Sequence, residues 1–223
     1  MYDIALYGHL TFDTIIDGVN PFSYNIGGIA NVWRALKEIN DELSIYICPI
    51  NIGISSIVLN KKESERRSNS YLNQIDVLYK IQDAAISHIS YLNEIDYPSF
   101  IQNLKGCVSA DICLGRKIDI SLFPEIKYLF VSEEDLELIK NLESFKGNLV
   151  IHGPEASSIR YTAGNYYRYH HYEYLTNVNV LGAGDYFAAS YINNLLNQME
   201  NGTNMQFSHI ATTNYLKARK EGK

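Results

Sequence analysis

The chain has 223 residues, of which 46% are hydrophobic and 20% charged, so it can bury one sizeable core. Its formal net charge of -6 argues against a nucleic-acid-binding surface, which needs a basic domain. The three cysteines form no CxxC pair, which argues against a disulfide scaffold and favours a reducing compartment.

The first part of the chain is predicted to form strands. Residues 2–7 are apolar except for Asp3 and stop at Gly8, which indicates a short buried strand. Two further short strands are predicted within residues 13–26, on either side of a glycine- and proline-containing turn. A second apolar strand is expected at 44–50, and a hairpin or exposed loop at 55–70.

A helix is predicted to begin at Gly27-Gly28. Apolar residues recur after these glycines at helical spacing, so one face of the helix is expected to pack on a sheet. These residues are Ile29, Val32, Trp33, Leu36 and Ile39.

The second half of the chain alternates apolar strands with candidate helices. The strands are predicted at 86–92, 109–115, 127–132, 148–153 and 166–175. Pro98 leads one predicted helix, Glu133 opens an acidic one, and Asp185 opens a long amphipathic one. Such alternation indicates a mostly parallel sheet covered on both faces, with ligands at the carboxyl ends of its strands.

The segment Gly182-Ala183-Gly184-Asp185 carries the strongest chemical signal. Glycines let backbone amides converge on an oxyanion, and a helix N-terminus adds about half a positive charge. Asp185 would repel a phosphate there unless it serves as a base or is offset by Mg²⁺. The alternative is structural, with Asp185 near the helix N-cap and the glycines forming a tight turn.

A dinucleotide-binding turn is a second alternative for this segment, because Gly182 and Gly184 with Ala188 imitate its glycine pattern. That fold needs a further strand–helix–strand unit and an acidic residue about 20 positions on. The residues after Asp185 indicate helix instead, which disfavours this alternative.

Several segments together resemble the ribokinase-like (PfkB) carbohydrate kinase family. They are GHLTFD (8–13), GGIANVWRAL (27–36), IKYLFVSEEDLELI (126–139), NLVIHGPEAS (148–157) and LGAGDYFAAS (181–190), in the family's order. The resemblance covers nearly the whole chain and implies a short, divergent member. It implies one α/β domain over 1–223, a three-layer α/β/α sandwich with a mostly parallel sheet. A small, reduced β lid is expected from about 13–26 and 54–70.

The resemblance also implies roles for individual residues. Asp185 would take the proton from the acceptor hydroxyl, and the amides of Gly182, Ala183 and Gly184 would stabilise charge on the transferring phosphoryl group. The acceptor-binding residues would be Asp13, Gly27, Gly28 and Asn31. The donor-binding residues would be His152, Gly153, Ala156 and Asn179. Asp135 would hold Mg²⁺ through water.

Two departures from the family pattern leave alternatives open. The family's Asp-Thr before the glycine signature is Asn179-Val180 here, which removes a carboxylate and a hydroxyl beside the anion hole. The family's Asn-x-x-Glu is Ser132-x-x-Asp135, which is also the pattern of a helix-capping box. Capping and Mg²⁺ coordination are compatible, so both interpretations of Asp135 are kept.

The implied function is phosphorylation of a small sugar or sugar derivative by ATP and Mg²⁺ in the cytoplasm. One alternative is a relative without activity that binds sugar or nucleotide as a sensor or subunit, and another is a nucleoside kinase. No nucleic-acid partner is expected, because the net charge is negative. No membrane partner is expected either, because no window approaches 18 uninterrupted apolar residues. The oligomeric state stays open, a homodimer included.

Overall fold

A mixed β-sheet forms the centre of the computed structural model. The structure describes residues 1–16, 23–60, 65–74, 80–96, 98–113, 115–161, 164–171, 175–176 and 178–220. The sheet contains β1 (Tyr2–Ile16), β2 (Ser23–Gly28), β3 (Ile45–Asn60), β4 (Glu65–Gln74), β5 (Ala84–Ile89), β6 (Cys107–Ile112), β8 (Ile126–Ser132), β10 (Asn148–His152), β11 (Ala156–Arg160) and β12 (Tyr166–His170). Within the described ranges the strand order is β12-β11-β10-β8-β6-β5-β1-β3-β4, with β2 paired to β1.

The middle of this sheet is parallel, as predicted. Each neighbouring pair from β3 through β1, β5, β6 and β8 to β10 runs parallel, whereas β2, β4, β11 and β12 are attached antiparallel. The apolar run from Ile4 to Tyr7 in β1 is fully buried. Burial on both faces is typical of a central parallel strand and explains the continuous apolar run.

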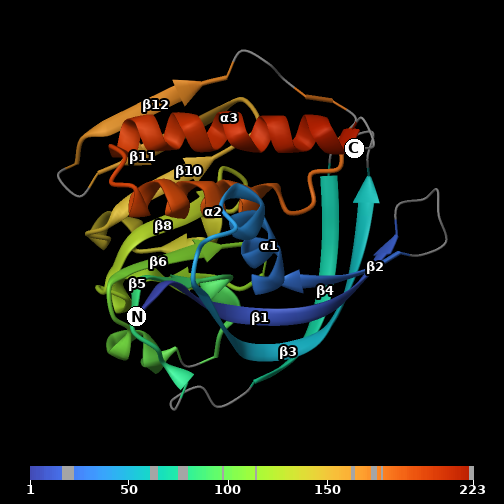
Figure 1. The fold of residues 1–223 in the computed structure, drawn as a ribbon, viewed down its shortest axis with the longest axis horizontal. Helices are drawn as coiled ribbons and strands as arrows, with labels where there is room; N and C mark the ends of the chain where they lie inside the picture. The colour runs from blue at the N-terminus through green and yellow to red at the C-terminus, as the bar shows by residue number, and fades with distance from the viewer. Residues whose placement is uncertain are drawn as a thin grey trace.

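Three α-helices among the described residues cover one face of the sheet (Figure 1): α1 (Ile29–Ile39), α2 (Ala183–Leu196) and α3 (Asn201–Lys220). Val32 and Leu36 of α1 share one apolar core with Phe187 and Ile192 of α2. The predicted helical face is correct except at Trp33, which is 37% exposed. The predicted helix at Asp185 begins two residues earlier, at Ala183.

Short 3₁₀ helices cover the opposite face. They are η2 (Leu92–Glu94), η3 (Ser99–Asn103), η4 (Ile120–Leu122), η5 (Leu136–Leu138) and η6 (Leu142–Ser144), joined by the small sheet of β7 (Ile118–Asp119) and β9 (Ile139–Lys140). The α/β fold class is confirmed, but the helices predicted at Pro98 and Glu133 are 3₁₀ turns. The segment that connects β8 to β10 contains β9 and Asn141, both of which prevent a continuous helix after Glu133. Asn141 has a φ of 55°, which a right-handed helix does not allow.

The prediction that the first strand stops at Gly8 is wrong. The register shifts between Gly8 and His9, and β1 then continues to Ile16, paired with β3 on one side and β2 on the other. We call residues 9–16 of β1, 51–60 of β3, and all of β2 and β4 the arm. The turn predicted near residues 18–21 and residues 61–64 of the predicted hairpin lie outside the described residues.

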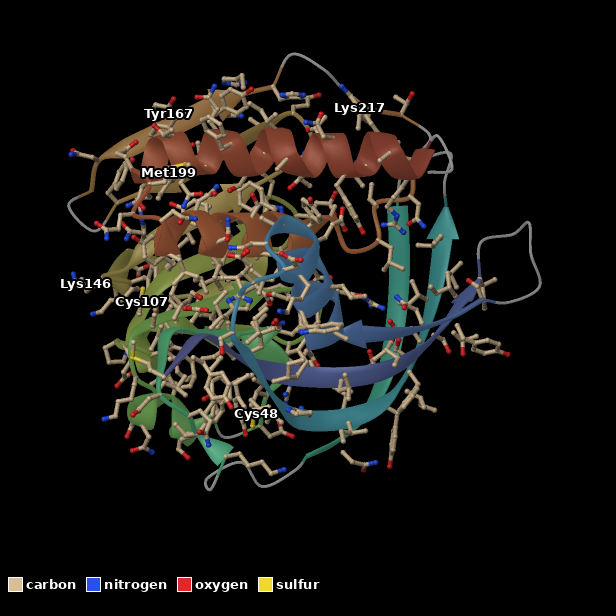
Figure 2. All side chains as sticks on the ribbon, viewed as in Figure 1. Cys48, Cys107, Lys146, Tyr167, Met199 and Lys217 are labelled. Atoms are coloured by element: carbon tan, nitrogen blue, oxygen red, sulfur yellow. The ribbon has the colours of Figure 1, made fainter. Side chains whose placement is uncertain are left out.

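Side chains fill the space between the sheet and the helices (Figure 2). Cys48 is buried on β3 and Cys107 is half-buried on β6. No helix within the described ranges has the length and apolar character needed to cross a membrane.

Candidate active site

Asp185 lies in the first turn of α2 and is only 6% exposed. The residue before the helix, Gly182, adopts φ 80° and ψ 7°. This left-handed conformation favours glycine, so the glycine at this position is explained by the turn that opens the helix. The result is a buried carboxylate at the N-terminus of a helix, where the first backbone amides have no hydrogen-bond partner within the helix.

The amides of the glycine loop are not all equivalent. The Ala183 amide donates to the Val180 carbonyl at 3.0 Å and closes the turn, whereas the Tyr186 amide makes the first helical bond to Gly182. Among the described residues, the Gly184 amide has no backbone partner. In this conformation Gly184 is therefore better placed than Ala183 to offer an amide to an anion.

Asn31 and Tyr91 donate hydrogen bonds to the Asp185 carboxylate. The amide nitrogen of Asn31 lies 3.0 Å from Asp185 Oδ2, and the hydroxyl of Tyr91 lies 2.9 Å from Asp185 Oδ1. Asn31 is among the residues predicted from the sequence, but Tyr91 is not. Tyr91 is one of 18 tyrosines, and no spacing or motif distinguishes it from the others.

Asp13 lies on the arm and is 4% exposed. Its Oδ1 accepts a hydrogen bond of 2.5 Å from Ser55 on β3, its neighbour in the parallel register. Gly27 packs directly on the other oxygen, since an added Cβ there would overlap Asp13 Oδ2. Gly27 precedes Gly28, which caps α1, and Asn31 follows in the first turn. The structure thus joins the predicted acceptor residues into one continuous path that ends at Asp185.

Buried polar atoms lie beneath this path. His9 and Asn51 are adjacent on β1 and β3, with Asn51 Nδ2 3.0 Å from His9 Nδ1. His9 Nε2 and Asn51 Oδ1 find no hydrogen-bond partner among the described residues. Burial lowers the pKa of His9 to about 4, so its imidazole is neutral at pH 7.

The predicted donor residues adjoin the glycine loop from the other side. His152 ends β10, and an added Cβ on Gly184 would lie 3.3 Å from its Cε1 atom. The neighbouring Gly153 donates its amide to the Ala156 carbonyl at 2.9 Å. Ala156 as a whole residue is only 1% exposed, so it offers almost no accessible surface to a ligand in this conformation. Asn179 accepts from the Leu181 amide at 3.0 Å and shapes the loop that leads to Gly182.

Ser132 and Asp135 bond to each other within a turn, but they do not form the predicted helix-capping box, because the 3₁₀ turn that follows has its N-cap at Asp135, without a side-chain capping bond. Ser132 Oγ donates to Asp135 Oδ2 at 2.8 Å, and the Asp135 amide donates back to Ser132 Oγ at 3.1 Å. Glu133, which is not among the site residues predicted from the sequence, places its Oε2 atom 2.5 Å from where a Cβ on Gly153 would lie. Its carboxylate therefore covers the turn that follows His152.

The loop before Gly182 is held from two directions. Arg219 on α3 donates to the Leu181 carbonyl at 2.6 Å and to the Tyr215 hydroxyl at 3.1 Å. The Leu181 side chain packs in a separate apolar cluster with Ile57 and Leu59 of the arm. No local pattern in the sequence signals either contact, because α3 and the arm meet this loop only in the folded chain.

Comparison with known proteins gives a fold assignment. No family model and no curated protein matches the chain. Solved structures of ribokinase-family kinases do match it over nearly their full lengths. A pyrophosphate-dependent kinase in the ribokinase family is 12% identical, with a TM-score of 0.71, and the match covers 96% of this chain and 95% of that one.

Two further solved structures are similar. An adenosine kinase from Sinorhizobium meliloti is 12% identical, with a TM-score of 0.72 and coverage of 95% of this chain and 93% of that one. A ribokinase from Thermotoga maritima is 15% identical, with a TM-score of 0.68 and coverage of 95% and 92%. At this level of identity the similarity establishes a ribokinase-like fold, and the chemistry has to be argued from the site.

Proposed function

We propose that the protein transfers a phosphoryl group from ATP or pyrophosphate to a hydroxyl of a small sugar-like acceptor. The observation that carries the proposal is the buried Asp185 carboxylate at the N-terminus of α2, beside a glycine loop and within hydrogen-bonding distance of Asn31. A carboxylate beside an anion-binding loop is unfavourable in a simple phosphate binder, and it is useful where a hydroxyl must lose its proton.

The acceptor would lie between the arm and the N-terminus of α2. Asp13 and Asn31 would receive its hydroxyls, because a carboxylate accepts hydrogen bonds and a side-chain amide both donates and accepts them. The unpartnered polar atoms of His9 and Asn51, at the base of the described part of this region, favour a hydroxyl-rich acceptor over an apolar one. The arm would act as the lid, with Ile57 and Leu59 against Leu181 reducing access of water.

The donor would lie on the side of His152 and Gly153. Asp185 would accept the acceptor's proton while the amides of Gly182 and Gly184 and the dipole of α2 stabilise charge on the transferring group. The oxygen-rich set at the end of β8 fits Mg²⁺, which keeps several waters and uses few carboxylates. Glu133 and Asp135 would hold it through water, and Mg²⁺ when bound would offset the negative charge of the donor.

Ligand-dependent thermal stability tests the donor side and separates an enzyme from a sugar-binding sensor. ATP or pyrophosphate with Mg²⁺, at 100-fold over its Kd, is expected to stabilise the protein by about 2.7 kcal/mol and raise Tm by roughly 5–10 °C. Asp135→Ala should reduce the shift seen with Mg²⁺ and leave the shift with the donor alone. Glu137→Ala, on the exposed side of η5, is the matched control.

Turnover should be assayed in parallel with both donors against sugars, polyols and nucleosides. Consumption of either donor with an acceptor supports the proposal. If neither donor shifts Tm at millimolar concentration and neither is consumed, the kinase proposal is wrong. Stabilisation by a sugar alone would then support the sensor or subunit alternative.

Removal of the Asp13 carboxylate is expected to weaken acceptor binding. Asp13→Ala deletes one buried acceptor of hydrogen bonds and leaves Ser55 without its partner, so acceptor affinity should fall by about 1–3 kcal/mol. Donor affinity should be unchanged, because Asp13 lies on the arm. Isothermal titration with each substrate measures both values, and an equal loss of donor affinity would show that Asp13 serves the fold rather than the acceptor.

A further inference from the structure

Tyr91 has an unusual backbone conformation for a large side chain. It follows the end of β5 and caps η2 with φ 57° and ψ 52°, in the left-handed region that non-glycine residues rarely adopt. Such a conformation persists only where surrounding contacts enforce it, and it concentrates at functional sites.

Contacts from the core enforce the conformation of Tyr91. Its backbone amide donates to Asp111 Oδ1, and the other Asp111 oxygen lies 3.4 Å from His88 Nε2. His88 Nδ1 is in turn 3.0 Å from the Ser109 hydroxyl. His88 and Ser109 are fully buried and Asp111 is 8% exposed, so these side chains belong to the interior, although His88 Nε2 makes no hydrogen bond to Asp111.

The ring of Tyr91 also has contacts that orient it. It stacks on the His9 imidazole with 5.9 Å between ring centroids and 15° between the planes. His9 is itself fixed by Asn51 at 3.0 Å. In this orientation the hydroxyl of Tyr91 donates to Asp185 Oδ1 at 2.9 Å.

We propose that Tyr91 is a positioning residue for Asp185, an inference that rests on the proposed role of Asp185 as the base. The Tyr91 hydroxyl and the Asn31 amide each hold one oxygen of the carboxylate, which fixes its rotation about the Cβ–Cγ bond. The carboxylate then faces the acceptor in a defined direction. Rotation of this group would misplace the proton acceptor by about an ångström, a displacement that costs catalysis roughly 100-fold.

Tyr91→Phe tests the inference, because phenylalanine keeps the ring stacked on His9 and removes only the hydroxyl. With the best acceptor from D-ribose, D-fructose, myo-inositol and adenosine, kcat is expected to fall roughly 10- to 100-fold. The KM values for donor and acceptor should stay within about twofold of wild type, because no substrate contact is lost. Tyr166→Phe, at an exposed tyrosine of β12, is the control and should leave kcat unchanged.

The outcomes separate this inference from the proposed function. Unchanged kcat in an active Tyr91→Phe protein overturns the positioning role alone, and a raised acceptor KM with unchanged kcat would make Tyr91 a substrate contact instead. If the wild type consumes neither donor, the proposed function is wrong. Crystal structures of wild type and Tyr91→Phe then decide the inference: a carboxylate rotated in the variant supports it, and an unmoved carboxylate overturns it.

Discussion

Asp185→Asn is expected to lower kcat by roughly 10²–10⁴-fold, the range for loss of a general base. Asparagine keeps the size of the side chain and can still occupy the first turn of α2. It cannot take a proton from a hydroxyl, and its NH₂ group would face the donors on Asn31 or Tyr91. The loss should therefore fall on kcat, with donor affinity retained or raised, because a negative charge beside the anion-binding loop has been removed.

Steady-state kinetics and donor titration measure the two quantities separately. Asp41→Asn, at an exposed turn after α1, is a matched control with the same chemical change away from the site. Turnover close to wild type in Asp185→Asn would contradict the assignment of Asp185 as the base. A loss of donor affinity equal to the loss of kcat would show that the substitution damaged the glycine loop.

Local sequence patterns predict those parts of the fold that depend on neighbouring residues. The apolar run of β1, the spacing of Ile29, Val32 and Leu36, and the glycines before Asp185 each specify a conformation within a few residues. The continuation of β1 beyond Gly8 escapes prediction because an apolar run ends there. Pairing with β2 and β3 sustains the strand instead, and that pairing joins residues distant in the sequence.

The site is predictable in part for the same reason. Asp13, Asn31 and Asp185 belong to segments that resemble a known family, so their proximity is expected from the resemblance. Tyr91 has no such segment, and its position depends on Asp111 and on the ring of His9. Residues placed by distant partners leave no periodic or motif signal.

Gly28→Ala is expected to destabilise the protein by about 3 kcal/mol or more. Gly28 caps α1 at φ 64° and ψ -132°, a region that residues other than glycine rarely adopt and that costs them about 1–3 kcal/mol. An added Cβ would also overlap the carbonyl oxygen of His9, and overpacking against backbone adds about 1–3 kcal/mol. Thermal or urea unfolding measures the loss, and a Tm within about 2 °C of wild type would contradict the expected clash with the His9 backbone.

Gly27→Ala is the matched neighbour and should act on binding more than on folding. Its added Cβ would overlap Asp13 Oδ2 and Thr11 Oγ1, which are side-chain atoms and not backbone, so the expected loss of stability is only about 1 kcal/mol. The displaced carboxylate would then miss the acceptor, and acceptor affinity should fall roughly 10- to 100-fold with donor affinity unchanged. Equal destabilisation by the two substitutions would mean that Asp13 is as immobile as the backbone. In that case the part of the arm around Asp13 would be rigid, and its side chains would not move when the acceptor binds.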